Sequence, residues 1–145
     1  MFHNILVAID GSSSAQRALQ HAIDLAEALH ARLTIVTVAS EVPGFAATAG
    51  LDTGVLEEAA EDEGVKRLRE ATDLVPQSVS VTTILRHGSA ARQILKVAKE
   101  GNYDLIVMGS RGRGRLASNV LGSVTADVHF ATRLPMLVIH PEAGD

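Results

Sequence analysis

Along the chain, short apolar runs alternate with longer segments in which apolar residues recur every three or four positions. Each short run is rich in β-branched residues and too short for a helix, so it predicts a buried strand. The strands are expected at residues 5–9, 33–38, 79–85, 105–108 and 134–139. Helical spacing occupies about residues 15–29, 55–71, 91–98 and 118–131. This alternation predicts an α/β fold: a doubly wound, five-stranded parallel sheet with helices on both faces.

The connections between these elements carry further signals. Ser12 or Ser13 can cap the first helix by accepting hydrogen bonds from its free amides. Ser40 to Gly54 predicts a loop, and loops of about 15 residues are usually functional or mobile. Arg86 to Ser89 predicts a turn before the third helix. Pro135 has no amide to donate, which predicts that the last strand lies at an edge of the sheet.

Acidic residues crowd the first half of the second predicted helix. They are Glu57, Glu58, Glu61, Asp62 and Glu63. The helix dipole favours negative charge near a helix N-terminus. We expect these residues to form a solvated face, and recognition by a partner protein is the alternative.

Composition limits both the architecture and the kinds of partner. A chain of 145 residues predicts a single domain, 1–145, whose core needs no disulfides. The absence of cysteine excludes a thiolate metal site and a cysteine nucleophile. A net charge of −4 and an aromatic share of 3% argue against nucleic-acid binding, which uses positive surfaces and aromatic stacking. No apolar run approaches the ~18 residues of a membrane span and no signal-peptide pattern is present, so we expect a cytoplasmic protein without a membrane partner.

The densest chemical signal is the stretch GSRGRGRL, residues 109–116, which follows the fourth predicted strand. Its glycines allow backbone amides to approach an anion, and its arginines add charge and forked donors. The stretch therefore predicts a phosphate site. It is not a P-loop, because Arg115 and Leu116 stand where that motif requires Lys and Ser or Thr. A dinucleotide-binding turn is also rejected, because the glycines follow the fourth strand and no acidic residue ends the next strand about 20 positions on.

A third pattern does fit the sequence: Gly109-x2-Gly112-x9-Gly122-Ser123. Together with NILVAIDGS at 4–12, DLIVMGSRGRG at 104–114, LGSVT at 121–125 and the LPMLVI strand, it makes the chain resemble the universal stress protein family over essentially its full length. In that family this glycine pattern marks the ATP-binding branch. The resemblance implies an adenine nucleotide alpha hydrolase-like fold of strand order 3-2-1-4-5, with ATP as the ligand and Mg²⁺ on its phosphates.

The resemblance also places the ATP at the switch point between strands one and four, beyond their carboxyl ends. It implies that Asp10 lies near the ribose and phosphates and that Val38 contacts the adenine. The nucleotide-binding residues that it implies are Ala8, Ile9, Asp10, Val38, Met108, Gly109, Arg111, Gly112, Gly122, Ser123, Val124 and Thr125. A homodimer through the fifth strand, Leu134 to Ile139, is implied as well.

The implied function is that of a nucleotide-dependent stress-response regulator with at most slow ATP hydrolysis. The alternative is a dimeric interaction scaffold in which the nucleotide is structural or absent. A hydrolysing or adenylating enzyme of the related superfamily is disfavoured, because residues 10–14 read DGSSS where those enzymes carry S-G-G-x-D-S.

The six histidines lack metal-ligand spacing, so no metal ligand or catalytic residue is assigned, and His87 is a candidate for the pocket rim. One or both of Arg113 and Arg115 are expected to be solvated.

Overall fold

The strands form one parallel sheet in a computed structural model that describes residues 1–112 and 121–142. They are β1 (Asn4–Ala8), β2 (Arg32–Ala39), β3 (Val81–His87), β4 (Leu105–Gly109) and β5 (Met136–Ile139). Their spatial order is β3-β2-β1-β4-β5, and each neighbouring pair is parallel. The predicted sheet and its order 3-2-1-4-5 are therefore confirmed. Because the chain changes direction across the sheet between β1 and β4, a crevice is expected at their carboxyl ends.

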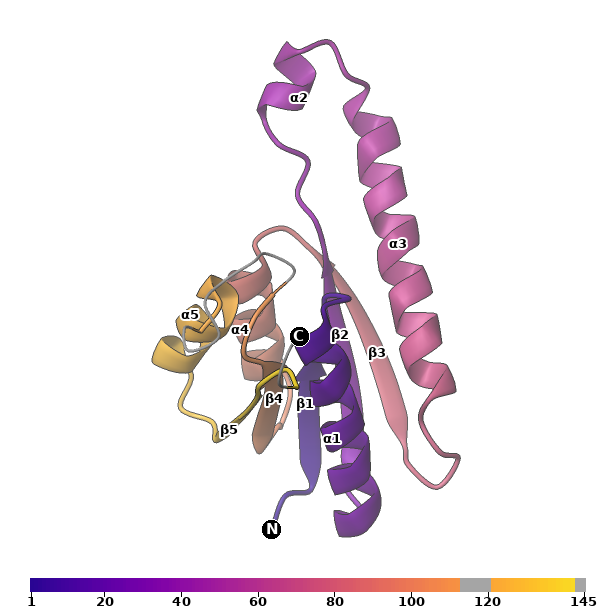
Figure 1. Cartoon of the computed structure of the whole chain (residues 1–145), viewed down its shortest axis with the longest axis vertical. Coiled ribbons are helices and arrows are strands. Elements are labelled where there is room, and N and C mark those ends of the chain that lie inside the picture. The colour runs from indigo at the N-terminus through magenta and orange to yellow at the C-terminus, as the bar shows by residue number, and fades with distance from the viewer. Residues whose placement is uncertain (113–120, 143–145) are drawn as a thin grey trace.

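Helices cover both faces of the sheet. They are α1 (Ser13–Leu29), α2 (Phe45–Thr48), α3 (Thr53–Asp73), α4 (Ala90–Glu100) and α5 (Ser123–Ala131). α1 and α3 pack on one face, whereas α4 and α5 pack on the other, as Figure 1 shows. None of the helices within the described residues is long and apolar enough to cross a membrane.

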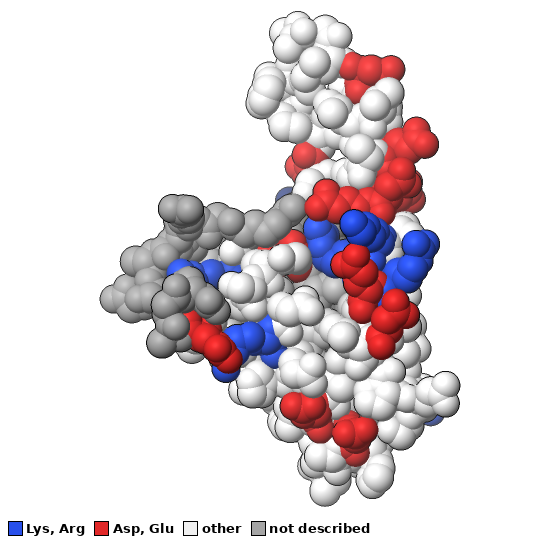
Figure 2. Space-filling model, turned by 45° about the vertical axis from the view of Figure 1, so that its right-hand side comes forward, with Lys and Arg blue, Asp and Glu red and all other residues white. Residues whose placement is uncertain are grey.

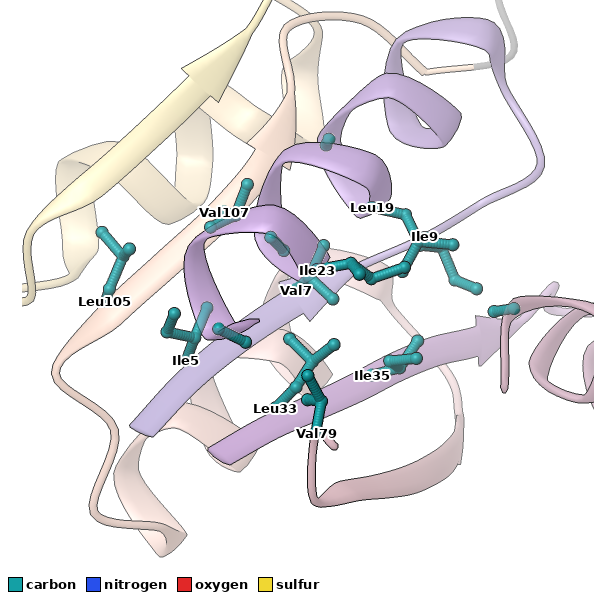
Figure 3. Close-up of a cluster of buried hydrophobic side chains, with 14 of the residues drawn as sticks. Ile5, Val7, Ile9, Leu19, Ile23, Leu33, Ile35, Val79, Leu105 and Val107 are labelled. Carbon is teal, nitrogen blue, oxygen red and sulfur yellow. The ribbon is translucent and has the colours of Figure 1, made fainter. Parts of the chain in front are cut away.

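Two clusters of buried apolar side chains join these layers, one on each face of the sheet. Because successive strand residues point to opposite faces, Ile5 and Val7 face α1 whereas Leu6 and Ala8 face α4. Figure 3 shows the first cluster, in which Leu19 of α1 lies over the strands. Burial on both faces explains why the central strands β1, β2 and β4 are rich in apolar residues in the sequence.

The structure corrects three sequence-based boundaries. Segment 40–54, predicted as a loop, contains the one-turn helix α2. β3 extends through His87, so Arg86 belongs to a strand and not to a turn. Pro135 precedes β5, and its carbonyl accepts a hydrogen bond from the Ile106 amide at 3.0 Å. β5 does lie at the edge of the sheet, as Pro135 predicted.

Residues 40–63, named the arm from here on, project beyond the carboxyl ends of the strands (Figure 1). Of these residues only Ala46 is buried, and α3 begins to pack on the sheet at Gly64. A Cβ on Gly64 would lie 2.7 Å from Cδ1 of Leu85, which shows how closely the helix approaches β3 there. The five acidic residues of α3 predicted to be solvated are all exposed, and Figure 2 shows acidic side chains along the arm below a mostly uncharged tip.

Candidate functional site

A cavity of about 630 Å³ opens at the carboxyl ends of β1, β2 and β4. The starts of α4 and α5 complete its walls. Its volume falls in the range of about 300–1,000 Å³ that is typical of small-molecule sites. Every nucleotide-binding residue implied by the sequence resemblance lines this one cavity: Ala8, Ile9, Asp10, Val38, Met108, Gly109, Arg111, Gly112, Gly122, Ser123, Val124 and Thr125.

The lining has an apolar wall and a polar region. The apolar wall consists of side chains that the strands and α4 direct to the same side of the sheet: Ala8, Val36, Val38, Ile94 and Met108. The polar region gathers near the glycines and includes Asp10, Arg111 and Ser123. A ligand with one flat apolar part and one anionic part matches this division.

Asp10 lies in the turn that connects β1 to α1. Its Oδ1 accepts a hydrogen bond from the Ser12 amide at 2.9 Å, and Gly11 between them has the left-handed φ of 86° that glycine tolerates. The Ser12 hydroxyl then accepts from the Ala15 amide at 3.2 Å, which confirms Ser12 as the helix cap. The second carboxylate oxygen, Oδ2, would lie 3.2 Å from a Cβ on Gly112, so Asp10 faces the glycine loop.

Ser14 ties the first turn of α1 to the loop after β4. Its side chain is buried, and its hydroxyl donates to the Arg111 carbonyl at 2.6 Å. The same oxygen accepts from the Arg111 amide at 3.3 Å. Because a single hydroxyl holds both backbone groups of Arg111, this residue enters the cavity wall from a fixed position.

Gly109 allows α1 and β4 to approach each other. A Cβ at this position would lie 2.5 Å from Oγ of Ser14 and 2.7 Å from the backbone nitrogen of Ala15. No real side chain tolerates such contacts, so the first glycine of the pattern is required for helix–strand packing. Its carbonyl accepts the buried hydroxyl of Thr125 at 2.7 Å, which ties β4 to α5.

Gly122, at the start of α5, lies close to the backbone of Gly112. The Gly122 amide donates to the Ser110 carbonyl at 2.7 Å, and Gly122 is the N-cap of α5. A Cβ on Gly122 would lie 3.2 Å from the backbone nitrogen of Gly112 and 3.3 Å from Cα of Arg111. The first amides of α5 are therefore held beside the cavity, where free helix amides attract anions.

Several lining residues were missed by the sequence-based prediction. They are Ala15, Val36, Ala39, Ser40, Glu41, Gly88, Ser89, Ala90 and Ile94. Most follow β2 or β3, and the rule that parallel strands end at one edge of the sheet was the available signal. Ser89 is the N-cap of α4, but its side chain makes no capping hydrogen bond.

His87 does not line the cavity. It lies in a neighbouring hollow with Glu61, whose Oε1 is 3.8 Å from its Nε2.

The loop between β4 and α5 is described only at its two ends. Residues 113–120, which include Arg113 and Arg115, lie outside the described residues, and α5 is described from Ser123 onward. Over residues 1–112 and 121–142, no group of three or more His, Asp or Glu side chains is arranged to hold a metal ion.

Residues 1–140 match the model of the universal stress protein family. The chain belongs to the universal stress protein family. The universal stress protein YxiE of Bacillus subtilis is 35% identical over 150 residues, which cover 96% of this chain and 99% of YxiE.

Solved structures of universal stress proteins share the fold. Universal stress protein UspA from Lactobacillus plantarum superposes with a TM-score of 0.82 at 26% identity, covering 95% of this chain and 97% of that one. A universal stress protein in complex with cAMP has a TM-score of 0.61 at 27% identity, covering 96% of this chain and 97% of that one. The family and the nucleotide-binding type of α/β fold expected from the sequence are therefore confirmed.

Proposed function

We propose that this universal stress protein binds ATP in the cavity and acts as a nucleotide-dependent regulator of the stress response. The observation that carries the proposal is the complete glycine pattern, Gly109, Gly112, Gly122 and Ser123, beside one cavity of suitable size. The relative in complex with cAMP supports an adenine nucleotide as the ligand, since cAMP and ATP share the adenosine group.

The two parts of the lining fit the two parts of ATP. The aliphatic side chains of Ala8, Val38 and Met108 offer a slot for the adenine. None of the described lining residues is aromatic, so base recognition would rest on these contacts and on backbone hydrogen bonds. The phosphates would lie at the start of α5, where free amides and the Arg111 guanidinium favour negative charge.

Asp10 is the residue that we propose for Mg²⁺ brought in by ATP. Magnesium is usually held by one or two carboxylates together with the phosphates of the substrate. The Asp10 carboxylate lines the cavity and faces Gly112 of the glycine loop, so it stands beside the proposed phosphates. Universal stress proteins are generally not enzymes, and we propose at most slow ATP hydrolysis.

The direct test is a thermal shift with Mg-ATP on protein freed of nucleotide. A ligand present at 100 times its Kd stabilises the folded state by about 2.7 kcal/mol. For a chain of this size we expect the Tm to rise by roughly 5–10 °C. Chromatography of the supernatant after heat denaturation of untreated protein should also reveal released ATP. An unchanged Tm at saturating Mg-ATP contradicts the proposal.

We also propose a homodimer through β5. The carbonyls of Pro135 and Ile139 accept hydrogen bonds from the amides of Ile106 in β4 and Ser110 just after it, so strand alternation turns the amides of Met136 and Val138 to the open edge. Unpaired edge groups of this kind are a template for pairing with another strand. Phe130 on α5, the helix that precedes β5 in the chain, is 85% exposed.

A second candidate function is a dimeric scaffold that recognises a partner protein with the nucleotide structural or absent. The arm favours this candidate, because it carries exposed apolar side chains such as Phe45, Leu51 and Val55 above an acidic helix face. Isolation of a stable protein partner with a nucleotide-free chain would favour the scaffold. ATP released from the purified protein would favour the first function.

A further inference from the structure

The carbonyl of Ile9, the residue before Asp10, accepts a hydrogen bond from the face of the sheet that is opposite the cavity. β1 ends at Ala8, and the Ile9 amide still pairs with the Val36 carbonyl at 2.9 Å. The Ile9 carbonyl instead accepts the hydroxyl of Thr37 at 2.7 Å. Thr37 is 1% exposed, so this hydrogen bond is shielded from water. The backbone that leads into Asp10 is therefore fixed by a side chain of β2.

Arg67 of α3 completes the contact. Its Nη1 donates to the Thr37 hydroxyl at 3.0 Å, so this hydroxyl both donates and accepts. Its Nη2 lies 3.4 Å from Oε1 of Glu63, at the end of the arm. The Arg67 side chain is only 14% exposed, and its Nε would be 3.3 Å from a Cβ on Gly11. The guanidinium thus lies against the turn that contains Asp10.

We propose that Arg67 and Thr37 are positioning residues for the nucleotide site. They form a relay that runs from α3 through β2 to the Ile9 carbonyl and holds the Asp10 turn in its binding geometry. Neither residue lines the proposed ATP cavity, so neither is expected to touch the nucleotide. The relay keeps the turn ordered before the ligand arrives, which lowers the free-energy cost of ordering it when the nucleotide binds. This inference rests on the proposed binding of ATP at that cavity.

Position 37 of the relay needs a side chain with a hydroxyl group. The Thr37 hydroxyl is required because it must donate to a carbonyl and accept from a guanidinium at the same time. Valine has nearly the same shape as threonine but can do neither. Serine keeps the hydroxyl and loses only a methyl group. Removing the hydroxyl leaves the Ile9 carbonyl and the Arg67 donor without this partner.

The experiment compares the Kd for Mg-ATP of the wild-type chain with Thr37→Val, Thr37→Ser and Arg67→Met, by isothermal titration calorimetry at a temperature where all are folded. We expect roughly tenfold weaker binding for Thr37→Val and for Arg67→Met, and binding within about twofold of wild type for Thr37→Ser. Because the two residues act in series, the double variant Thr37→Val with Arg67→Met should lose no more affinity than either single change. Thr34→Val provides the matched control. It removes a buried hydroxyl from the other end of β2, opposite Leu6, and should not change the Kd.

The outcomes separate this inference from the proposed function. A wild-type chain that binds no ATP overturns the proposed function and the relay with it. A wild-type chain that binds ATP, with unchanged affinity in Thr37→Val, overturns the relay alone. Fully additive losses in the double variant, or no recovery in Thr37→Ser, would also overturn it.

Discussion

Replacing Gly109 by alanine tests how the cavity is built, because the new methyl group would meet the backbone of α1. Its Cβ would lie 2.5 Å from Oγ of Ser14, 2.7 Å from the Ser14 carbonyl carbon and 2.7 Å from the Ala15 nitrogen. Two of these atoms are backbone and cannot rotate away. α1 must therefore move away from β4, which also loosens the two hydrogen bonds between Ser14 and Arg111.

The expected loss of stability follows from these contacts. Overpacking a close-packed interior costs about 1–3 kcal/mol, and each weakened hydrogen bond adds about 1 kcal/mol. We therefore expect Gly109→Ala to lower the free energy of unfolding by about 3–5 kcal/mol and the Tm by about 10 °C. The chain contains no Trp, so urea unfolding is best followed by far-ultraviolet circular dichroism.

Gly44→Ala is the matched control for this experiment. Gly44 has a φ of −56°, and no atom of the described residues beyond its chain neighbours lies within 4 Å of the position of its Cβ, so the same substitution should change stability by less than about 0.5 kcal/mol. A Gly109→Ala protein within about 1 kcal/mol of wild type would refute the reasoning. It would mean that α1 and β4 do not require a glycine between them.

Three further predictions concern the loop and the edge of the sheet. Ser14→Ala should cost about 1–3 kcal/mol in urea unfolding and weaken Mg-ATP binding in calorimetry, since the Arg111 backbone loses its buried partner. Gly122→Ala should raise the Kd for Mg-ATP about tenfold with little change in Tm, because its Cβ would press on the Gly112 nitrogen at 3.2 Å; an unchanged Kd would contradict the site. Val138→Pro should convert a dimer into a monomer in light scattering, because it removes an outward amide of β5, and a persisting dimer would exclude that edge.

The central strands β1, β2 and β4 were predictable because they are buried on both faces. A run such as Ile5 to Ile9 is uninterrupted by polar residues only where neither face meets water. The strand order and the site residues on β1 and β4 came instead from the resemblance to the universal stress protein family, which placed the switch point between these two strands.

The arm was not predictable in the same way. The helix α2 spans only Phe45–Thr48, and four residues are too few to show a periodic apolar pattern. Its single buried residue, Ala46, gives no signal that differs from the surrounding small residues. The relay through Thr37 was equally hidden, because a threonine within an apolar strand looks like an ordinary β-branched residue.

The glycines of the pattern look equivalent in the sequence, but the structure gives them different roles. Gly109 is required by the approach of α1, and Gly122 is pressed against the loop backbone. Gly112 is exposed at the cavity, and among the described residues only the Asp10 carboxylate lies within 4 Å of the position of its Cβ. The pattern therefore reflects how the chain leaves β4 and how it enters α5 beside the cavity. Loss of Gly109 should thus impair folding and binding together, whereas a change at Gly112 should act on the ligand first.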